Sequence, residues 1–303
     1  MIDLDALVSL RAVSTHGSVS AAADALGFTP SAVSQQVKRL ERQVGLALLE
    51  RVGRGVILTD TGRRLVTSGG SLLQDLERVE SDLHHAAGSV SGVLRIATFS
   101  TAVRGLVAPA LGPVVRTHPD LRLKITEHEP WDAVARVADG RADLGVVHSW
   151  GDVPISVPEH LDSREIARDV ADVVVPAGHA LAERRRVRPA DLVEVEWIAT
   201  PEGTICRQWL DRMYVGTGRT PRIAHVSMEF DSHLALVEAG LGIALVPRLG
   251  RAPLADGVRA LEAHDPVPTR TVTALHRRSM KDSPAVLAVL DALSRTAAPP
   301  SAR

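Results

Sequence analysis

The sequence has a single cysteine, few aromatic side chains and no excess of basic residues. One cysteine, Cys206, excludes a disulfide within the chain and fits the reducing cytoplasm. Aromatic residues are only 3% of the 303, but apolar residues reach 45%, which is enough to build cores for two or three compact units. Because the formal net charge is −1, any basic surface for nucleic acid must be local.

Several signals of membrane proteins and enzymes are also missing. No apolar run is long enough to span a bilayer, and the first five residues are acidic, so we expect no membrane segment, no signal peptide and a cytoplasmic protein. No His-x-x-x-His or Cys-x-x-Cys spacing suits zinc, and no phosphate-binding glycine motif follows a strand, so we expect neither metal nor cofactor. The sequence places no histidine or acid beside Cys206. A partly buried structural thiol is therefore favoured over a nucleophile, and we expect no enzyme.

Residues 18–44 indicate two helices joined by a tight turn. Ser18 is a candidate N-cap of a short alanine-rich helix, which Gly27 ends because glycine tolerates a left-handed backbone. Thr29 caps the second helix, and Pro30 occupies its first position, where a missing N–H costs nothing. The second helix has an apolar stripe at Val33, Val37, Leu40 and Val44, and an opposite polar face at Ser31, Ser34, Gln35, Lys38 and Arg39.

Spacing alone leaves two interpretations of this helix pair open. One is an ordinary helical hairpin whose polar face meets water. The other is a DNA-reading pair, in which hydroxyls, an amide and cations meet base edges and phosphates in the major groove. A first helix, from Asp3 to about residue 15, would pack beneath the pair through a face made of Leu4, Leu7, Val8, Leu10 and Arg11. The residues that follow the pair favour the second interpretation.

The first sixty residues resemble the winged helix-turn-helix of the LysR-type transcriptional regulators. The matching positions are Ala21-Ala22, Ser31-Ala32-Val33-Ser34, Leu40-Glu41, Gly45, Arg51, Leu58-Thr59 and Gly62. The chain departs from the family at Leu49, where Phe is more frequent, and at Pro30, where Gln is common. The first departure is a core substitution, whereas the second removes a possible polar contact with DNA.

The resemblance also implies a wing that lies along the sugar-phosphate backbone, with Arg54 and Gly55 at the turn between its two strands. Helix face and wing together give the candidate DNA contacts: Thr29, Pro30, Ser31, Ala32, Ser34, Gln35, Lys38, Arg39, Arg51 and Arg54.

A long helix follows, capped by Thr59 and expected to reach about residue 87. Its apolar residues are spaced by seven, four, three and four positions, which is a heptad seam suited to a partner helix. Gly69 and Gly70 interrupt it, at a cost of about 1 kcal/mol each relative to alanine, and would allow a close approach or a bend. The alternative is a helix lying on its own domain, whereas in the resembled family this segment is a dimerising linker helix. The candidate dimer contacts are Leu65, Leu72, Leu76, Val79 and Leu83.

After a hinge at residues 88–92, strand and helix patterns alternate, which predicts an α/β fold with a mostly parallel sheet. Expected strands are 93–98, 121–126, 144–148, 173–175, 197–199, 223–226, 243–246 and 271–275. Expected helices are 103–116, 131–139, 189–193, 206–215, 231–239 and 283–296. Residues 236–247 match a segment typical of LysR effector domains, so the resemblance implies two lobes like those of periplasmic binding proteins.

These patterns divide the chain into five parts. We expect a winged helix-turn-helix DNA-binding domain at 1–58 and a dimerising linker helix at 59–88. The first effector-binding lobe would comprise 89–163 and 264–297, and the second lobe would comprise 164–263. A flexible tail would occupy 298–303.

Ligands of open α/β sheets bind beyond the carboxyl ends of the strands, and four such ends carry polar groups here. Hydroxyls that open a helix can hold an anion together with the free helix amides, although each alone is more often a helix cap. A carboxyl and an imidazole at other ends would suit a ligand with a donor or positive group. The candidate effector contacts are Ser100, Thr101, His148, Thr200, Gly203, Thr204, Ser227 and Glu229.

Together these features predict a LysR-type DNA-binding regulator that senses a small, carboxylate-bearing metabolite between two lobes. Its expected partners are promoter DNA, the effector, further copies of the chain in a homodimer or homotetramer, and RNA polymerase if it activates. Effector binding would alter the spacing of the DNA-binding heads. Two alternatives remain open: a DNA-binding protein that needs no effector, and an enzyme or transport-type binding protein with a helical extension.

Overall fold

The computed structural model describes residues 2–53, 55–86, 89–151 and 153–297, and two compact units, residues 1–80 and 81–303, are described separately below. The predicted flexible tail, Arg54 and the expected end of the linker helix at 87–88 lie outside the described residues.

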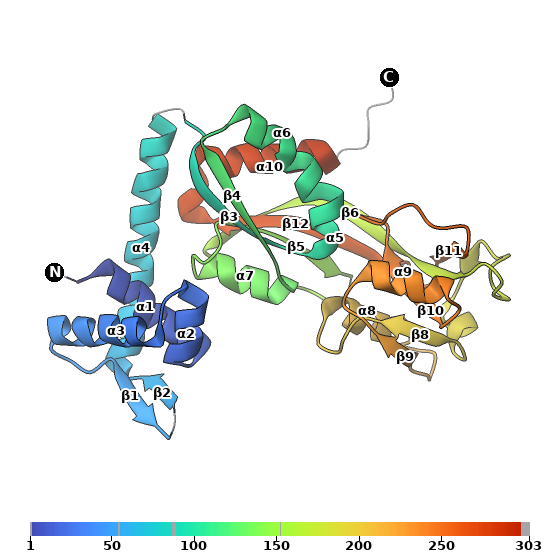
Figure 1. Cartoon of the computed structure of the whole chain (residues 1–303), viewed down its shortest axis with the longest axis horizontal. Helices are drawn as coiled ribbons and strands as arrows, with labels where there is room; N and C mark the ends of the chain where they lie inside the picture. The colour runs from blue at the N-terminus through green and yellow to red at the C-terminus, as the bar shows by residue number, and fades with distance from the viewer. Residues whose placement is uncertain (1, 54, 87–88, 152, 298–303) are drawn as a thin grey trace. The chain divides into compact units, whose positions relative to one another are not determined.

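The first unit is a three-helix core with a two-stranded wing. Helices α1 (Leu4–His16), α2 (Val19–Leu26) and α3 (Pro30–Val44) pack together, and β1 (Leu49–Val52) pairs antiparallel with β2 (Gly55–Leu58), as labelled in Figure 1. The predicted caps are confirmed: Ser18 accepts from the amide of Ala21, and Thr29 accepts from the amide of Ala32. Val33, Val37 and Leu40 of the predicted stripe are fully buried.

Helix α1 begins one residue later than expected, because Asp3 is its N-cap and accepts from two first-turn amides. The expected packing face was also placed partly wrong. Val8 and Arg11 are only half-buried, whereas Ala6, Ser9, Ala12 and Val13 join Leu7 and Leu10 in the interior. Small side chains let the three helices approach closely, so the buried face is wider than the large apolar residues indicated.

Helix α4 (Asp60–Ala86) confirms the predicted long helix. Thr59 accepts a hydrogen bond from the amide of Gly62 at its start. A Cβ atom added at Gly69 would lie 2.6 Å from the Leu7 methyl carbons, whereas a Cβ at Gly70 would meet nothing within 4 Å. Of the two expected roles of this glycine pair, close approach is therefore confirmed at Gly69, where α4 passes over α1.

The second unit is a continuous sheet of ten strands with helices on its faces. Its main path runs in the order β4-β3-β5-β12-β6-β10-β8-β9; off this path, β11 pairs with β6, and β7 pairs with β11. The strands are β3 (Gly92–Thr98), β4 (Leu121–Glu127), β5 (Leu144–Trp150), β6 (Leu161–Pro176), β7 (Arg186–Val187), β8 (Glu196–Ala199), β9 (Arg222–Val226), β10 (Ile243–Pro247), β11 (Val258–Ala263) and β12 (Thr269–Arg277).

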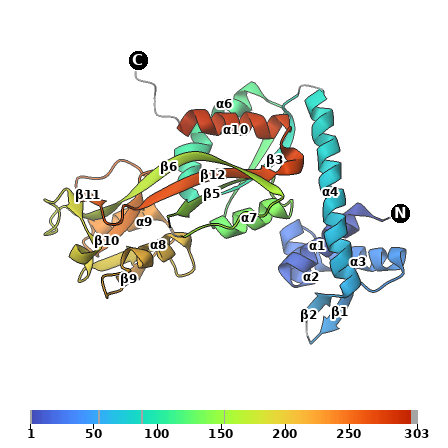
Figure 2. The same cartoon turned by 180° about the vertical axis from the view of Figure 1, so that it is seen from behind.

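Two long strands join the two lobes of this sheet. The first half of β6 pairs antiparallel with β12, and its second half pairs antiparallel with β10 and β11. Figure 2 shows β6 and β12 running side by side from one lobe toward the other. Pairs that do not involve β6 or β12 are parallel, such as β3 with β4 and β5, and β8 with β9 and β10. Strand β12 pairs antiparallel with β5 as well as with β6. The sheet was expected to be mostly parallel, and its antiparallel pairs are those made by the two long strands β6 and β12.

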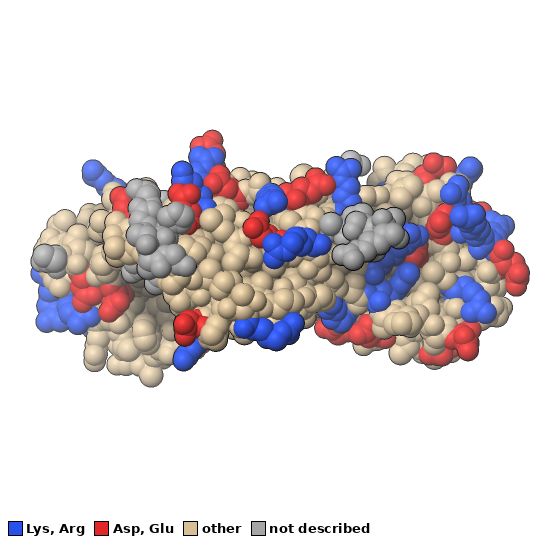
Figure 3. Space-filling view, turned by 90° about the horizontal axis from the view of Figure 1, so that it is seen from above, with Lys and Arg blue, Asp and Glu red and all other residues tan. Residues whose placement is uncertain are grey.

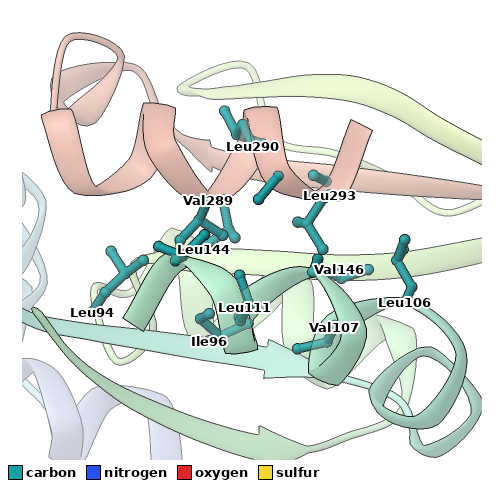
Figure 4. Packing of buried hydrophobic residues seen from close by; sticks show 14 of the residues in the cluster. Leu94, Ile96, Leu106, Val107, Leu111, Leu144, Val146, Val289, Leu290 and Leu293 are labelled. Atoms are coloured by element: carbon teal, nitrogen blue, oxygen red, sulfur yellow. The ribbon is translucent and has the colours of Figure 1, made fainter. Parts of the chain in front are cut away.

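Each lobe has apolar clusters on both faces of its sheet. In the first lobe, a continuous helical segment of α5 (Ser100–Ala102), a π-helical turn (Val103–Val107) and α6 (Ala108–Thr117) packs beside α10 (Pro284–Ala297), while α7 (Pro130–Ala138) covers the other face. Figure 4 shows Leu106, Val107 and Leu111 facing Val289, Leu290 and Leu293 across strand residues such as Leu144 and Val146. In the second lobe, α8 (Ile205–Met213) and α9 (Phe230–Glu238) take corresponding places.

A few local expectations were wrong in the second unit. The helix expected at 103–116 begins earlier, at Ser100, and the segment expected at 189–193 is a short 3-10 helix (Pro189–Leu192). Strand β11 was missed because its alternation of polar and apolar residues covers only six positions. No helix of the described residues is long and apolar enough to cross a membrane.

Candidate functional site

The second helix of the helix-turn-helix presents the predicted polar face. Thr29, Pro30, Ser31, Gln35, Lys38 and Arg39 are exposed, and Ala32 and Ser34 are half-buried. These residues share the face opposite the buried stripe, and an open groove of about 1140 Å³ runs beside the helix past Gln35, Lys38 and Arg42. The structure therefore brings the expected side chains together on one accessible surface of the first unit.

One ion pair and two hydrogen bonds shape this surface. Arg39 forms an ion pair with Asp3 at 2.8 Å, which holds its guanidinium beside the start of α1. Glu41 turns inward instead and accepts from the amides of Leu48 and Leu49, at 2.8 and 3.2 Å, which fixes the chain at the start of the wing. Arg51 on the wing is exposed, and the predicted contact Arg54 lies outside the described residues.

Helix α4 carries a line of exposed apolar side chains. Leu72, Leu76, Val79 and Leu83 are 50%, 41%, 54% and 66% exposed, at the spacing of the predicted seam. Leu65, the first residue of that seam, differs because it packs against the helix-turn-helix core with Val66. Its burial is thus accounted for within its own unit, whereas the other four side chains belong to none of the apolar clusters that the described residues form.

A cleft of about 300 Å³ lies between the two lobes of the second unit. Residues from the ends of β3, β4, β5 and β8 and from the starts of α5, α7, α8 and α9 line it, as expected for strand ends of an open α/β sheet. Its lining comprises Phe99, Ser100, Thr101, Glu127, His128, Glu129, Asp132, His148, Thr200, Thr204, Cys206, Met228, Glu229, Phe230 and Arg270. The volume is at the lower end of that of small-molecule sites.

A buried arginine organises the floor of this cleft. Arg270, 1% exposed, donates from Nε to Asp169 at 2.9 Å and from Nη2 to the Thr101 hydroxyl at 2.8 Å. Its guanidinium also lies over the rings of Phe99 and Trp150, at 5.1 and 5.5 Å from their centroids. The ion pair with Asp169 neutralises the charge of Arg270. Arg270 therefore contributes mainly by holding Thr101 in place through a hydrogen bond, and it contributes little net positive charge to the cleft.

The helix that begins at Ser100 has no side-chain cap. Its N-cap residue is Phe99, which supplies no oxygen, although α5, the π-helical turn and α6 continue without a break to Thr117. The first-turn amides and the positive end of the helix dipole therefore lack an acceptor from an N-cap side chain. Ser100 is half-buried at this point, and both Ser100 and Thr101 line the cleft.

Polar contacts cross the cleft between the lobes. Glu129 is the N-cap residue of α7, but its side chain does not cap that helix. Its Oε2 instead accepts from the amide of Ile205, at the start of α8, at 3.1 Å. Arg104 donates to the carbonyl of Gly250 and lies 3.7 Å from Glu229 and 3.5 Å from Asp231. A carboxylate of one lobe thus completes a helix start of the other, so lobe arrangement and cleft chemistry are linked.

Burial shifts the pKa values of several groups in this cleft. Desolvation, followed by the nearby Arg270 charge, lowers the pKa of His148 well below 6.5, and burial lowers that of His128 as well, so both rings are neutral at pH 7. Burial raises the pKa of the Cys206 thiol to about 11. Burial also raises the pKa of Glu129, against the lowering effect of the Ile205 amide.

Six of the eight predicted effector contacts line the cleft. Gly203 and Ser227 do not: Gly203 is exposed, and Ser227 instead uses its carbonyl to bind the His233 ring at 2.9 Å. Glu129 and Arg270 also line the cleft, and neither was predicted from the sequence. Glu129 follows the carboxyl end of β4 by two residues, so its place in the cleft could have been expected from the general rule for parallel sheets. Arg270 left no local signal, because its partner Asp169 is 101 residues away.

Charge on the surface is mixed, in keeping with the net charge of −1. Figure 3 shows lysine and arginine side chains interspersed with aspartate and glutamate on the face that it draws. Among the residues that the structure describes, no group of His, Cys, Asp and Glu is placed to hold a metal ion.

Comparison with known proteins identifies this architecture. Residues 4–63 match the model of the bacterial regulatory helix-turn-helix proteins of the lysR family, and residues 87–298 match the LysR substrate binding domain. The chain is a LysR-type DNA-binding transcriptional regulator and belongs to that family. The family and the relatives named below are transcriptional regulators, not enzymes.

Relatives agree with this assignment, and solved structures share the fold. The RuBisCO operon transcriptional regulator of Allochromatium vinosum is 30% identical over 248 residues, 81% of this chain and 79% of that protein. The probable regulator LrrA of Synechococcus elongatus is 28% identical over 98% of each chain. A full-length OxyR variant from Pseudomonas aeruginosa shares the fold with a TM-score of 0.70 at 19% identity, covering 97% of this chain and 95% of that one. The structure of CbnR complexed with its target DNA has a TM-score of 0.55 at 22% sequence identity, and the match covers 97% of this chain and 100% of that one.

Proposed function

We propose that this regulator senses a small metabolite in the cleft between its two lobes and that the metabolite alters promoter binding. The cleft itself is the observation that carries the proposal: both lobes line it, and it holds hydroxyls, carboxyls and an uncapped helix start in about 300 Å³. The Glu129–Ile205 contact supports coupling, because a ligand that changes it favours one lobe arrangement over another.

An anionic group of the metabolite, such as a carboxylate, would bind at Ser100 and the first turn of the α5–α6 helix. The Ser100 hydroxyl and the uncapped amides supply donors, and the helix dipole favours negative charge there. Thr101 contributes less directly, since its hydroxyl already accepts from Arg270. Ser100 is therefore the residue that carries this part of the proposal.

DNA would be read by the exposed face of α3 and held by the wing. Ser31, Ser34 and Gln35 present hydroxyl and amide groups for base edges, and Lys38 and Arg51 present cations for phosphates. The relative CbnR has been solved bound to its target DNA, which supports a DNA complex for this chain too.

The chain would act as a homodimer or a dimer of dimers. Four apolar side chains on α4 are about half-exposed at heptad spacing, and a second α4 would cover them. We propose residues 1–58 as the DNA-binding domain and 59–88 as the dimerising linker. The first effector-binding lobe would comprise 89–163 and 264–297, and the second would comprise 164–263. RNA polymerase would be a further partner if the protein activates, and the cytoplasm would be its location.

Footprinting on the intergenic DNA beside its own gene tests this function. The chain should protect a defined site, and a metabolite that raises its melting temperature should change the protection pattern. If none of the metabolites raises the melting temperature or changes the footprint, the result would instead favour a DNA-binding protein that needs no effector. Failure to select any site would contradict promoter recognition.

A further inference from the structure

The cleft is lined by more negative than positive charge. Four carboxyl side chains line it, Glu127, Glu129, Asp132 and Glu229, against one guanidinium, Arg270. Arg270 is already paired with Asp169, and both histidines of the lining are neutral at pH 7 because their pKa values are lowered. A ligand that carries only negative charge would meet net repulsion here.

Glu129 stands out among these carboxyl groups. Glu229 lies near Arg104, whereas in the part of the chain that the structure describes no lysine or arginine forms an ion pair with Glu127, Glu129 or Asp132. Glu127 is exposed to solvent, but Glu129 is half-buried. Glu129 Oε2 accepts from the Ile205 amide, and none of the residues that the structure describes donates a hydrogen bond to Oε1. A half-buried carboxylate without a cation is costly unless a partner arrives.

A second, independent feature marks the same cleft as incomplete. His148 is 3% exposed and lines the cleft, yet its Nδ1 atom has no hydrogen-bond partner among the described residues. Buried polar atoms are rarely left unpaired in native proteins. A neutral imidazole can accept one hydrogen bond and donate another, so it can bind an N–H group of a ligand.

We propose that the effector carries a positively charged nitrogen, an ammonium or guanidinium, that pairs with the free oxygen of Glu129. This inference rests on the proposed sensing function and narrows the class of ligand. With an anionic group at Ser100, the ligand is zwitterionic, as an amino acid is. Glu129 Oε2 accepts from the Ile205 amide at the start of α8. A cation paired with Oε1 of the same carboxylate therefore places the ligand charge at this contact between the lobes.

A matched panel of compounds on the full-length protein tests the proposal. The panel comprises the standard amino acids, their decarboxylated amines, and the N-acetyl derivative of each, screened by thermal shift and then titrated by calorimetry. We expect at least one free amine to bind, and its N-acetyl derivative, which lacks the charge, to bind about tenfold or more weakly. An N-acetyl compound that binds as tightly as its amine would overturn the proposal, as would a panel without any amine that binds.

Two variants separate Glu129 from general cleft charge. Glu129→Gln keeps an acceptor for the Ile205 amide and removes the charge, so it should weaken binding of the amine about tenfold or more and leave the N-acetyl compound unaffected. Glu127→Gln removes the same charge from an exposed site in the same cleft and should change the dissociation constant less than about threefold. Equal effects of the two variants would overturn the role of Glu129.

The panel also distinguishes this inference from the function on which it rests. If carboxylates without an amine stabilise the protein and alter its footprint, the sensing function stands and the cationic ligand is wrong. If no compound stabilises the protein and the footprint never changes, both are wrong.

Discussion

Arg270 illustrates how a single buried side chain can determine the geometry of a site. It connects Asp169 of the crossing strand to Thr101 at the start of a helix and lies against two aromatic rings. Replacing Thr101 would therefore disturb Arg270 as well as any ligand, so Ser100→Ala is the cleaner probe of the proposed anion site. Arg270 donates to the hydroxyl of Thr101 and not to that of Ser100, and loss of the Ser100 hydroxyl removes one donor.

Cys206 should be a poor nucleophile, although it lies near a helix start. With its pKa raised to about 11, its thiolate population at pH 7.5 is about two orders of magnitude below that of an ordinary cysteine thiol. Because a thiolate of higher pKa is also more nucleophilic, the net effect is smaller, and we expect iodoacetamide to alkylate the folded protein at least about tenfold more slowly than glutathione at that pH, with rates measured by mass spectrometry. Alkylation as fast as that of glutathione would contradict a buried, protonated thiol.

Specific and general DNA contacts should separate at the level of single residues. Gln35→Ala should weaken binding to the preferred site by about 1–3 kcal/mol and relax one base position. Arg51→Ala should weaken binding to all sequences and reduce the salt slope by about 1, because it removes a phosphate contact. Titrations on the footprinted site and on scrambled DNA at two salt concentrations measure both. If Gln35→Ala lowers both affinities equally, α3 does not read the bases.

At the scale of elements, the glycine pair of α4 offers a matched comparison. Gly70→Ala should stabilise the protein by up to about 1 kcal/mol, because alanine favours a helix and its Cβ meets nothing. Gly69→Ala should be destabilising instead, by about 1 kcal/mol net, because its Cβ would overlap the buried Leu7 side chain. Denaturant unfolding of the two variants measures this difference. Equal effects of both substitutions would contradict the close approach of α4 to α1.

The exposed stripe of α4 should determine assembly. Leu76→Asp would bury a carboxylate in a helix pair without a partner, so the dimer should dissociate and binding to a two-half-site operator should collapse. Thr67→Asp, which adds the same charge to an exposed position of the same helix off the seam, should leave the mass unchanged. Light scattering and gel-shift titration measure both. A Leu76→Asp variant of unchanged mass would place the dimer contact elsewhere.

Elements set by local chemistry were predictable from the sequence, and features set by distant pairing were not. Caps at Ser18 and Thr29 and the heptad spacing of α4 depend on neighbours within one or two turns, so their residues indicated them directly. Most of the cleft lining at strand ends followed from the general rule for parallel sheets. The antiparallel crossing of β6 and the pairing of Arg270 with Asp169 join residues about a hundred positions apart, which no local pattern records.

In the whole molecule, one chain would carry both a domain that reads DNA and a domain that senses a metabolite. The family assignment covers residues 4–63 and 87–298 and establishes the regulator class. What the cleft adds is a proposed link: a ligand bound at Ser100 and Glu129 touches the Glu129–Ile205 contact and thus biases how the lobes sit. In an assembly held together by α4, such a bias would reach the DNA-binding heads.

Binding of the intergenic DNA with and without a cleft ligand tests this link most directly. Fluorescence anisotropy titrations would use wild-type protein and Glu129→Gln, each with and without the amine that most raises the melting temperature. We expect the amine to change the DNA dissociation constant of the wild type by at least about fivefold, and the change to vanish in Glu129→Gln at the same amine concentration. A wild-type protein that is saturated with the amine and binds DNA with the same affinity and footprint would contradict the account.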